Sequence, residues 1–383
     1  MPEIILILLV LALSFANGSN DVSKGIATLT GCGLATYRKA LVWGTLWTIG
    51  GSLAAGVFSV EMVNTFAVGL LRNPVETQNF ASLHLGFNGL LPISVAFGAL
   101  VWVLFASLTG LPVSTTHAII GAICGVGVFS LGYKGVSWDA VISKMFIPLF
   151  VSPFCGLFLA FLIYPPLRLS MEKLYNWCVC FELKKEACSC NPAGTEVALL
   201  NTMESASGGL VLSTNEVCED TLFAPLKLNI PDIIHWLSSG LVCFARGLND
   251  APKIVAIGLT ISLSSYNQVF TFAMIAVTMG LGSYLGGLRV TQTLAEKVTK
   301  MNHIEGLSAN LITSLLVGAA ARFGLPVSTT HISSSAIIGI GLKHGRRGIC
   351  WNTVFSMVLA WFVTLPVSGI LSAIAYYAFL RIL

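Results

Sequence analysis

The chain has 383 residues, of which 55% are hydrophobic and only 10% are charged, and its mean hydropathy is +0.83. A soluble domain carries about 25% charged residues, so this composition excludes a soluble globular protein and predicts an integral membrane protein surrounded by lipid. The formal net charge of +4 comes from scattered basic residues, which argues against a nucleic-acid partner.

Ten apolar segments, five in each half of the chain, are candidates to cross a membrane, since a helical span needs about 20 mostly apolar residues. No Lys or Arg precedes the first segment, so we expect a membrane span there and not a cleaved signal peptide. The fourth segment of each half is broken by glycines, which favours a re-entrant hairpin over a simple span. The predicted segments are Ile4–Thr30, Leu41–Leu71, Leu83–Leu108, Leu111–Leu131, Val141–Leu167, Ile233–Leu263, Val269–Val290, Leu307–Ala321, Leu325–Leu342 and Trp351–Leu380.

A polar stretch separates the two halves. From Arg168 to about Asp232 the residues Glu, Lys, Asn, Ser and Cys replace the apolar ones, which predicts a linker that is partly disordered. The predicted domains are therefore a first transmembrane repeat at 1–167, a linker at 168–232 and a second transmembrane repeat at 233–383.

The number of crossings and the loop charges together predict the topology. Five crossings in each half is an odd number, so the second half should lie inverted relative to the first. Arg38 and Lys39 follow the first segment, whereas the equivalent loop of the second half, 262–268, carries no charge. Since basic loops face the cytoplasm, we expect external N- and C-termini and a cytoplasmic linker in a multi-pass protein of the cell membrane.

Four cysteines of the linker form two Cys-x-Cys pairs. In the reducing cytoplasm a structural disulfide is disfavoured, which leaves a soft-metal site or an incidental thiol cluster as the alternatives. The four residues are Cys178, Cys180, Cys188 and Cys190.

The string Gly-Leu-Pro-Val-Ser-Thr-Thr-His occurs twice, at Gly110–His117 and at Gly324–His331, which indicates a duplicated architecture. Pro tolerates the first turn of a helix, and Ser and Thr are good N-cap residues, so each string predicts a helix start. Such a start presents backbone N–H groups, hydroxyls and the positive end of a helix dipole to an anion. The alternative is that both strings merely cap two buried helices. The candidate anion-binding residues are Ser114, Thr115, Thr116, Ser328, Thr329 and Thr330.

A second related element lies in the first segment of each half, at Phe15–Lys24 and Phe244–Lys253, where Gly, Asn, Asp and Lys coincide in register. Charged residues within a span cost a few kcal/mol each, so they are expected to be paired and functional. Gly followed by Asn-Asp can unwind a helix, and the freed carbonyls beside a carboxylate and an amide would suit a small cation. The candidate cation-binding residues are Asn20, Asp21, Asn249 and Asp250, with sodium at the two aspartates.

The alternative for this element is structural. Asp21 and Asp250 would cap the following half-helix, and Lys24 and Lys253, three residues further on, would neutralise them.

Four further residues are accessory candidates, in addition to the two lysines. Arg246 stands where the first half has Asn17, and it could contact the anion or extend to the membrane interface. His117 and His331 close the repeated strings. We expect them to donate hydrogen bonds inside a packed hairpin, with a role in proton coupling as the alternative.

The paired Gly-x-Asn-Asp motifs and the paired Gly-Leu-Pro-Val-Ser-Thr-Thr-His strings resemble the inorganic phosphate transporter family, and the resemblance covers both halves. It implies an all-α, inverted-topology repeat transporter with about ten to twelve membrane segments, whose re-entrant hairpins meet at mid-membrane. It also implies an anion site at the six hydroxyl residues and a cation site at the two Asn-Asp pairs. Many members have Asn in place of Lys24 and Lys253, so the coupling ion, sodium or proton, stays open.

The expected function is that of a symporter that moves inorganic phosphate together with a cation, for which we expect sodium. A proton-coupled phosphate or sulfate permease and an anion channel are the alternatives. Motifs with metal-ligand spacing or a nucleophile and base pair are missing from the sequence, so an enzyme is not expected, and neither is a cofactor. A homodimer is an open option for the assembly.

Overall fold

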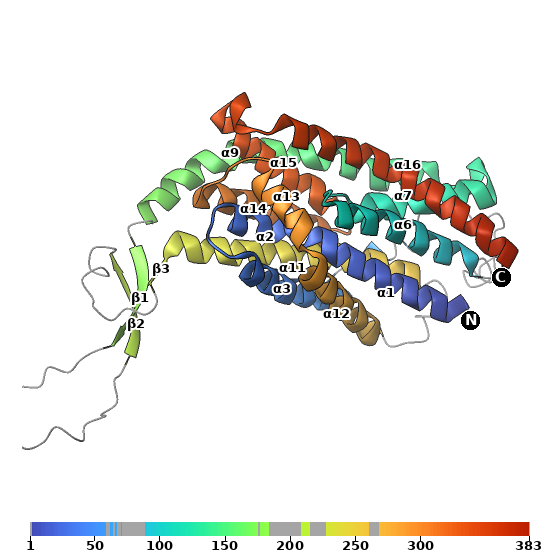
Figure 1. Ribbon diagram of the computed structural model, residues 1–383, viewed down its shortest axis with the longest axis horizontal. Helices are drawn as coiled ribbons and strands as arrows, with labels where there is room; N and C mark the ends of the chain where they lie inside the picture. Colours follow the sequence, from blue (N-terminus) through green and yellow to red (C-terminus); the bar gives the residue numbers. More distant parts are fainter. Residues whose placement is uncertain are drawn as a thin grey trace, which may run out of the picture.

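The computed structural model describes residues 2–58, 62, 63, 66, 70, 89–174, 177–183, 208–214, 227–259 and 268–382. The protein is a helical multi-pass membrane protein (Figure 1). Seven helices within these ranges are long and apolar enough to cross a membrane. The predicted fold class is therefore confirmed at the level of a helical membrane protein.

The first half forms a long interrupted helix, a second span, a hairpin and a long final helix. A π-helical turn at Val141–Phe146 precedes that final helix. The helices are α1 (Pro2–Asp21), α2 (Ser23–Gly31), α3 (Tyr37–Phe58), α6 (Leu90–Thr109), α7 (Thr115–Leu131), the short α8 (Trp138–Ala140) and α9 (Ile147–Leu174).

The polar segment between the halves contains a small antiparallel sheet, which the sequence analysis did not predict. Its strands are β1 (Trp177–Leu183), β2 (Gly208–Thr214) and β3 (Lys227–Asn229), in the order β2-β1-β3. Helix α9 also continues past Leu167 to Leu174, and an ion pair of 2.7 Å between Arg168 and Glu172 lies on this extension. Of the four linker cysteines, Cys188 and Cys190 lie outside the described residues, and Cys178 and Cys180 are described only by the backbone of β1.

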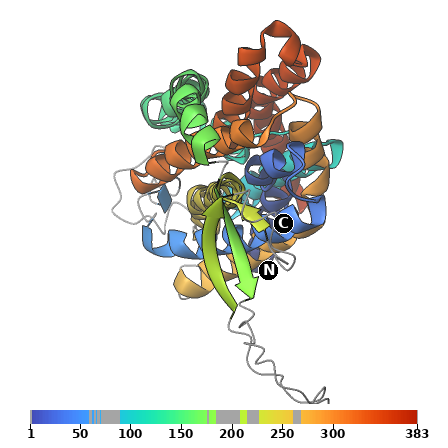
Figure 2. The same ribbon diagram turned by 90° about the vertical axis from the view of Figure 1, so that its left-hand side faces the viewer.

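The second half repeats the order of a long first helix, a second span, a hairpin and a long final helix, but its first helix is not divided. Its helices are α11 (Ile230–Leu259), α12 (Gln268–Gly286), α13 (Leu288–Glu296), α14 (His303–Arg322), α15 (Thr329–Gly341) and α16 (Trp351–Ile382). Figure 2 shows α11 end-on near the centre of the bundle, with other helices around it. This position explains why Arg246, Asp250 and Lys253 on α11 are buried.

Two helical hairpins enter the molecule from opposite ends. The α6–α7 hairpin lies toward the end that holds both termini, and the α14–α15 hairpin lies toward the end that holds the sheet (Figure 1). Gly110 and Gly324 follow α6 and α14 with φ of 75° and 65°, a left-handed conformation that glycine adopts without strain. The sequence analysis assigned the hairpin to the fourth segment of each half alone, whereas the third and fourth segments form it together.

The two halves are interlocked. Helix α1 packs on α12 and α6, and its counterpart α11 packs on α3 and α14. Likewise α7 packs on α16, and α15 packs on α9. The backbones of the two halves also approach closely at two equivalent places. Gly282 of the second half lies against the Phe15 carbonyl of the first, and Gly51 of the first half lies against the Phe244 carbonyl of the second. The centre of the molecule is therefore built from both halves equally.

Both chain termini lie at one end of the bundle and the sheet lies at the other (Figure 1). This arrangement agrees with an odd number of crossings before the linker. Which end faces the cytoplasm stays a prediction.

Candidate functional site

Each repeated string forms a helix start, as its residues predict. Ser114 and Ser328 are the N-cap residues of α7 and α15, with extended backbone conformations. Their hydroxyl oxygens accept hydrogen bonds from the backbone N–H groups of His117 and His331, at 3.3 and 3.1 Å. The capping role that was the structural alternative is thus real for both serines, and it holds the two helix starts in shape.

The two helix starts meet in the middle of the molecule. Thr330 donates its hydroxyl to the carbonyl of Val113 at 2.7 Å, and Thr116 donates reciprocally to the carbonyl of Val327 at 3.5 Å. The structure therefore brings the six predicted anion-binding residues to one centre. Each of them is at most 4% exposed: Ser114, Thr115, Thr116, Ser328, Thr329 and Thr330.

The first Asn-Asp pair connects the interrupted helix to the hairpin tip. Asn20 donates from Nδ2 to the Leu111 carbonyl at 3.0 Å and accepts from the Val113 N–H at 3.2 Å. Asp21 accepts at Oδ1 from Lys24 at 2.6 Å and at Oδ2 from the Thr115 hydroxyl at 3.3 Å. The carboxylate is fully partnered by groups of its own half.

The second Asn-Asp pair is less completely partnered. Asn249 donates to the Val327 carbonyl at 3.1 Å, but its Oδ1 is buried and has no hydrogen-bond partner among the described residues. Lys253 lies 3.1 Å from Asp250 and 2.6 Å from the hydroxyl of Thr116. A lysine of the second half therefore donates to the repeated string of the first half.

The predicted unwinding at these motifs is not found in either half. Helices α1 and α2 meet at Val22, whose backbone is still helical, with φ of −57° and ψ of −31°, and which accepts from the Ile26 N–H and donates to the Gly18 carbonyl. Helix α11 runs without a break through Asn249 and Asp250. The expectation of broken helices that free backbone carbonyls is therefore wrong. The long helix keeps its path although Pro252 lies inside it.

Arg246 and Asn17 form the hub of the cluster. Arg246 is 0% exposed, so it does not extend to the membrane interface, and this part of the expectation is wrong. Its guanidinium donates to Asn17 Oδ1 at 3.1 Å, to Thr48 at 2.9 Å and to Ser283 at 3.3 Å. Asn17 in turn donates to Asp21 at 2.9 Å, and it lies 3.4 Å from an oxygen of Asp250.

The sequence analysis missed Thr48 and Ser283, which lie on α3 and α12. Both are 0% exposed and both accept from Arg246. The available signal was a small hydroxyl residue within an apolar span. That signal is weak because such residues are common where helices pack closely.

The buried charges of this centre are three basic against two acidic side chains. With all five ionised, the cluster carries one excess positive charge, and none of the five is more than 3% exposed. Buried charges are expensive and are retained where they are paired or bind a ligand. The excess positive charge and the two helix starts therefore suit an anion. The five residues are Asp21, Lys24, Arg246, Asp250 and Lys253.

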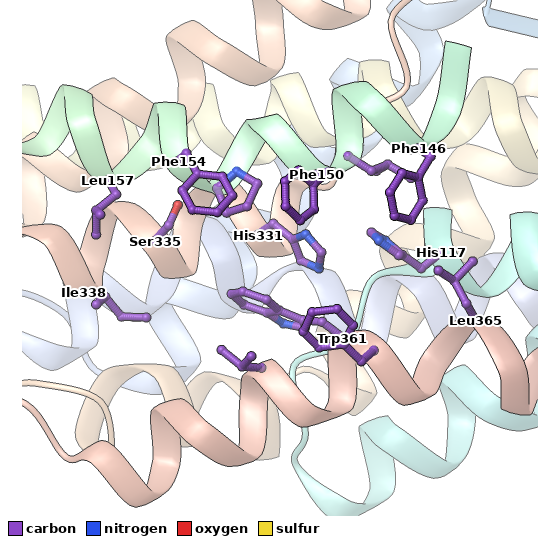
Figure 3. Close-up of a pocket in the computed structure, with 14 residues that line it drawn as sticks. His117, Phe146, Phe150, Phe154, Leu157, His331, Ser335, Ile338, Trp361 and Leu365 are labelled. Atoms are coloured by element: carbon purple, nitrogen blue, oxygen red, sulfur yellow. The ribbon is translucent and has the colours of Figure 1, made fainter. Parts of the chain in front are cut away.

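Among the described residues, neither histidine ring forms the predicted hydrogen bond with ordinary geometry, although His331 lies within reach of the Leu149 carbonyl. The two rings contact each other at a tilt, with centroids 4.5 Å apart, and His331 also contacts the tilted ring of Trp361 at 4.1 Å. Neither ring nitrogen of His331, nor Nδ1 of His117, has a hydrogen-bond partner among the described residues. Figure 3 shows both rings in a pocket between α9 and α16.

A family model described as the phosphate transporter family matches residues 17–372, which include both helix starts and both Asn-Asp pairs. The chain belongs to the phosphate transporter family. The predicted resemblance is therefore confirmed. Members of this family are transporters, so the chain is a transporter and not an enzyme.

Curated relatives agree along the whole chain. A probable low-affinity inorganic phosphate transporter of Mycobacterium bovis is 27% identical over 97% of this chain and 76% of its own length. A Bacillus subtilis protein with the same description is 26% identical over 98% of this chain and 96% of its own. The helical arrangement matches a solved structure titled "The sodium-dependent phosphate transporter" with a TM-score of 0.75, at 20% identity over 100% of both chains. That match shows the fold.

Proposed function

We propose that this protein is a secondary active transporter that carries inorganic phosphate together with a cation, and that phosphate binds between the N-terminal turns of α7 and α15. The observation that carries the proposal is the meeting of the two hydroxyl-capped helix starts beside a buried cluster with one excess positive charge. Each helix start adds about half an elementary positive charge. The names of the family and of the relatives supply phosphate as the anion.

The buried charges and the helix starts together supply the charge that a buried oxyanion needs. The cluster has one excess positive charge and the two helix starts add about half a charge each, which makes about two positive charges in total. Around neutral pH phosphate titrates between monoanion and dianion, and a bare dianion at mid-membrane would be very costly. This charge suits phosphate and sulfate alike, and we propose phosphate because the family and the relatives are named for it.

The arrangement of the halves supports alternating access. The hairpins enter from opposite ends and each contributes one helix start to the shared centre (Figure 1). We propose that the halves are inverted repeats and that a relative movement of the hairpins opens the site first to one side and then to the other. We also propose that the protein resides in the cell membrane, with external termini and a cytoplasmic linker.

Sodium fits the second Asn-Asp pair better than the first. A hard cation needs oxygen ligands, and the free Asn249 Oδ1 beside Asp250 provides them. At the first pair the Lys24 ammonium already lies 2.7 Å from Asn20 Oδ1 and 2.6 Å from Asp21 Oδ1. We therefore propose at most one sodium site, at Asn249 and Asp250.

The lysines also favour a second candidate, coupling to protons. Lys24 and Lys253 each place an ammonium among oxygen acceptors that a sodium ion would use. Lys24 donates to a carboxylate, a backbone carbonyl and an amide oxygen, and Lys253 donates to a carboxylate, a backbone carbonyl and a hydroxyl. A site that contains its own cations needs fewer from solution. A proton would then take the place of sodium as the coupling cation.

The test is uptake of labelled phosphate into proteoliposomes, with sodium and proton gradients imposed separately and sulfate as competitor. We expect accumulation of phosphate above its external concentration, driven by one of the two gradients and little affected by sulfate. Uptake that only equilibrates phosphate would indicate an anion channel. If sodium alone drives accumulation, sodium coupling is supported, and if only the proton gradient does, the lysine argument is supported.

A further inference from the structure

A pocket of about 330 Å³ lies next to the first turns of α7 and α15, where His117 and His331 line it (Figure 3). Helix α9 packs on α15 and helix α16 packs on α7, and the pocket lies between them. His117 and His331 line it from the helix starts, Phe150 and Phe154 from α9, and Trp361 from α16. The volume is in the range of small-molecule sites.

The mouth of the pocket faces lipid. Phe146, Phe150, Phe154 and Phe362 line the pocket and are all more than half exposed. They lie in membrane-spanning segments, where an exposed aromatic side chain contacts acyl chains and not water. A ligand would therefore enter from the bilayer.

The inner end of the pocket contains polar groups without partners. His331 is only 6% exposed, yet neither ring nitrogen forms a hydrogen bond of ordinary geometry with a described residue, and the same holds for Nε1 of Trp361. The carbonyl of Leu149, which lacks its usual helical donor because Pro153 has no N–H, accepts the Ser152 hydroxyl at 3.1 Å and lies within reach of one ring nitrogen of His331. The other ring nitrogen of His331 is left as an acceptor without a donor among the described residues. Buried polar groups are nearly always paired, so these groups point to a missing partner.

We propose that this pocket binds an uncharged, membrane-dissolved amphiphile that carries one hydroxyl group on an apolar body. No charged residue is among the described side chains that line the pocket, which disfavours an ionic ligand. The Trp361 N–H can only donate, and a neutral His331 ring has one nitrogen that accepts. A single hydroxyl satisfies both, because it accepts from Trp361 and donates to His331.

Occupancy of the pocket should inhibit transport. His117 and His331 follow Thr116 and Thr330 directly, so the pocket and the proposed phosphate site share the first turns of α7 and α15. A ligand wedged between these turns and the α9 and α16 helices would hold the hairpins in place. This consequence rests on the proposed transport function, whereas binding to the pocket does not.

The binding test is photolabelling of the purified protein in liposomes. The probe is a ten-carbon primary alcohol with a diazirine on its chain, and the comparison probe is the same chain without the hydroxyl. We expect the alcohol to label pocket residues at least several-fold more strongly, and 1-decanol to compete. Equal labelling by both probes would overturn the proposal, as would labelling spread evenly over the lipid-facing helices.

Two matched variants locate the site. Val358→Phe places an aromatic ring in the pocket. Leu359→Phe adds the same ring at the following residue, which is 52% exposed and does not line the pocket. Labelling should be lost in Val358→Phe and retained in Leu359→Phe, and Trp361→Phe should weaken it a few-fold.

In uptake assays 1-decanol should inhibit the wild type and Leu359→Phe, but not Val358→Phe. If uptake is missing in every form while labelling follows this pattern, the transport proposal fails and the pocket stands. If Val358→Phe is labelled like the wild type, the pocket proposal fails.

Discussion

The ammonium of Lys253 lies 2.6 Å from the hydroxyl of Thr116, so a buried charge from the second half of the chain is hydrogen-bonded to the repeated string of the first. The same ammonium lies 3.1 Å from Asp250 and 3.3 Å from the carbonyl of Val327, at the other helix start. One side chain therefore contacts both helix starts and the neighbouring carboxylate. Any movement of one hairpin relative to the other must break or exchange these contacts.

The first prediction concerns the buried pair of Asp21 and Lys24. Asp21→Asn leaves the ammonium of Lys24 buried without its carboxylate, which should lower the free energy of unfolding by about 3–5 kcal/mol and abolish uptake. In the double variant Asp21→Asn/Lys24→Met most of that stability should return, whereas uptake should not. Denaturant unfolding in detergent and proteoliposome uptake measure the two effects.

The exposed carboxylate of Glu3 provides the control for that pair. Glu3→Gln should leave both stability and uptake unchanged. If Asp21→Asn transported phosphate at the rate of the wild type, the aspartate would have no part in coupling or binding.

Arg246→Lys should reduce uptake at least ten-fold although it keeps the charge. The planar guanidinium donates to Asn17 on α1, Thr48 on α3 and Ser283 on α12. A lysine has a single nitrogen and cannot hold three acceptors on three helices in this geometry. We expect a loss of about 1–3 kcal/mol in stability from the unpaired partners. Uptake equal to the wild type would show that the hub needs only a positive charge.

The close helix crossings give a prediction with a neighbouring control. A Cβ at Gly51 or Gly282 would lie 2.0 Å from a backbone oxygen of the helix opposite, so alanine at either position should destabilise the protein by about 1–3 kcal/mol. At Gly50 the nearest atom would be 3.8 Å away, in the ring of Phe244. Gly50→Ala should therefore be tolerated. Equal melting temperatures for all three variants in detergent would contradict the interlocked packing.

Cys350 offers a test of sidedness. It is exposed at the start of α16, and hydrogen bonding from Thr353 lowers the pKa of its thiol, which favours the reactive thiolate. A membrane-impermeant maleimide should label it from the cytoplasmic side only, with Cys350→Ser as the control. In Cys350→Ser/Ile382→Cys, the new thiol at the other end should react from outside. The reverse pattern would overturn the proposed orientation.

The duplicated strings made the core of the site predictable. Because the same eight residues begin a helix in each half, the two helix starts were expected to meet at one centre. The structure places them there, since Thr116 donates to Val327 of the other string and Thr330 donates to Val113. The contacts of Arg246 with Asn17 were less predictable. The two residues occupy the same position of the repeat but differ in type, so the repeat does not indicate what either of them contacts. Only the packing of α1, α3 and α12 shows that these side chains meet.

Other features depend on contacts that hydropathy does not report. The strand β1 pairs with β2 and β3 across long stretches of polar sequence, so its neighbours cannot be inferred from apolar periodicity. The histidine pocket depends on how α9 and α16 pass each other, two helices that are far apart in the chain. For the same reason the unpartnered nitrogens of His331 could not be foreseen from the string that contains it.

The most direct test of the account is the equilibrium binding of labelled phosphate to the purified protein and to Thr115→Val and Thr329→Val, one from each helix start. Valine keeps the shape of threonine and removes the hydroxyl, and a hydrogen bond to a charged group contributes about 1.5–3 kcal/mol. We predict that each variant binds phosphate about ten-fold or more weakly, while Thr109→Val, at the exposed end of α6, binds like the wild type. Wild-type affinity in both Thr115→Val and Thr329→Val would contradict the claim that phosphate binds between the two helix starts.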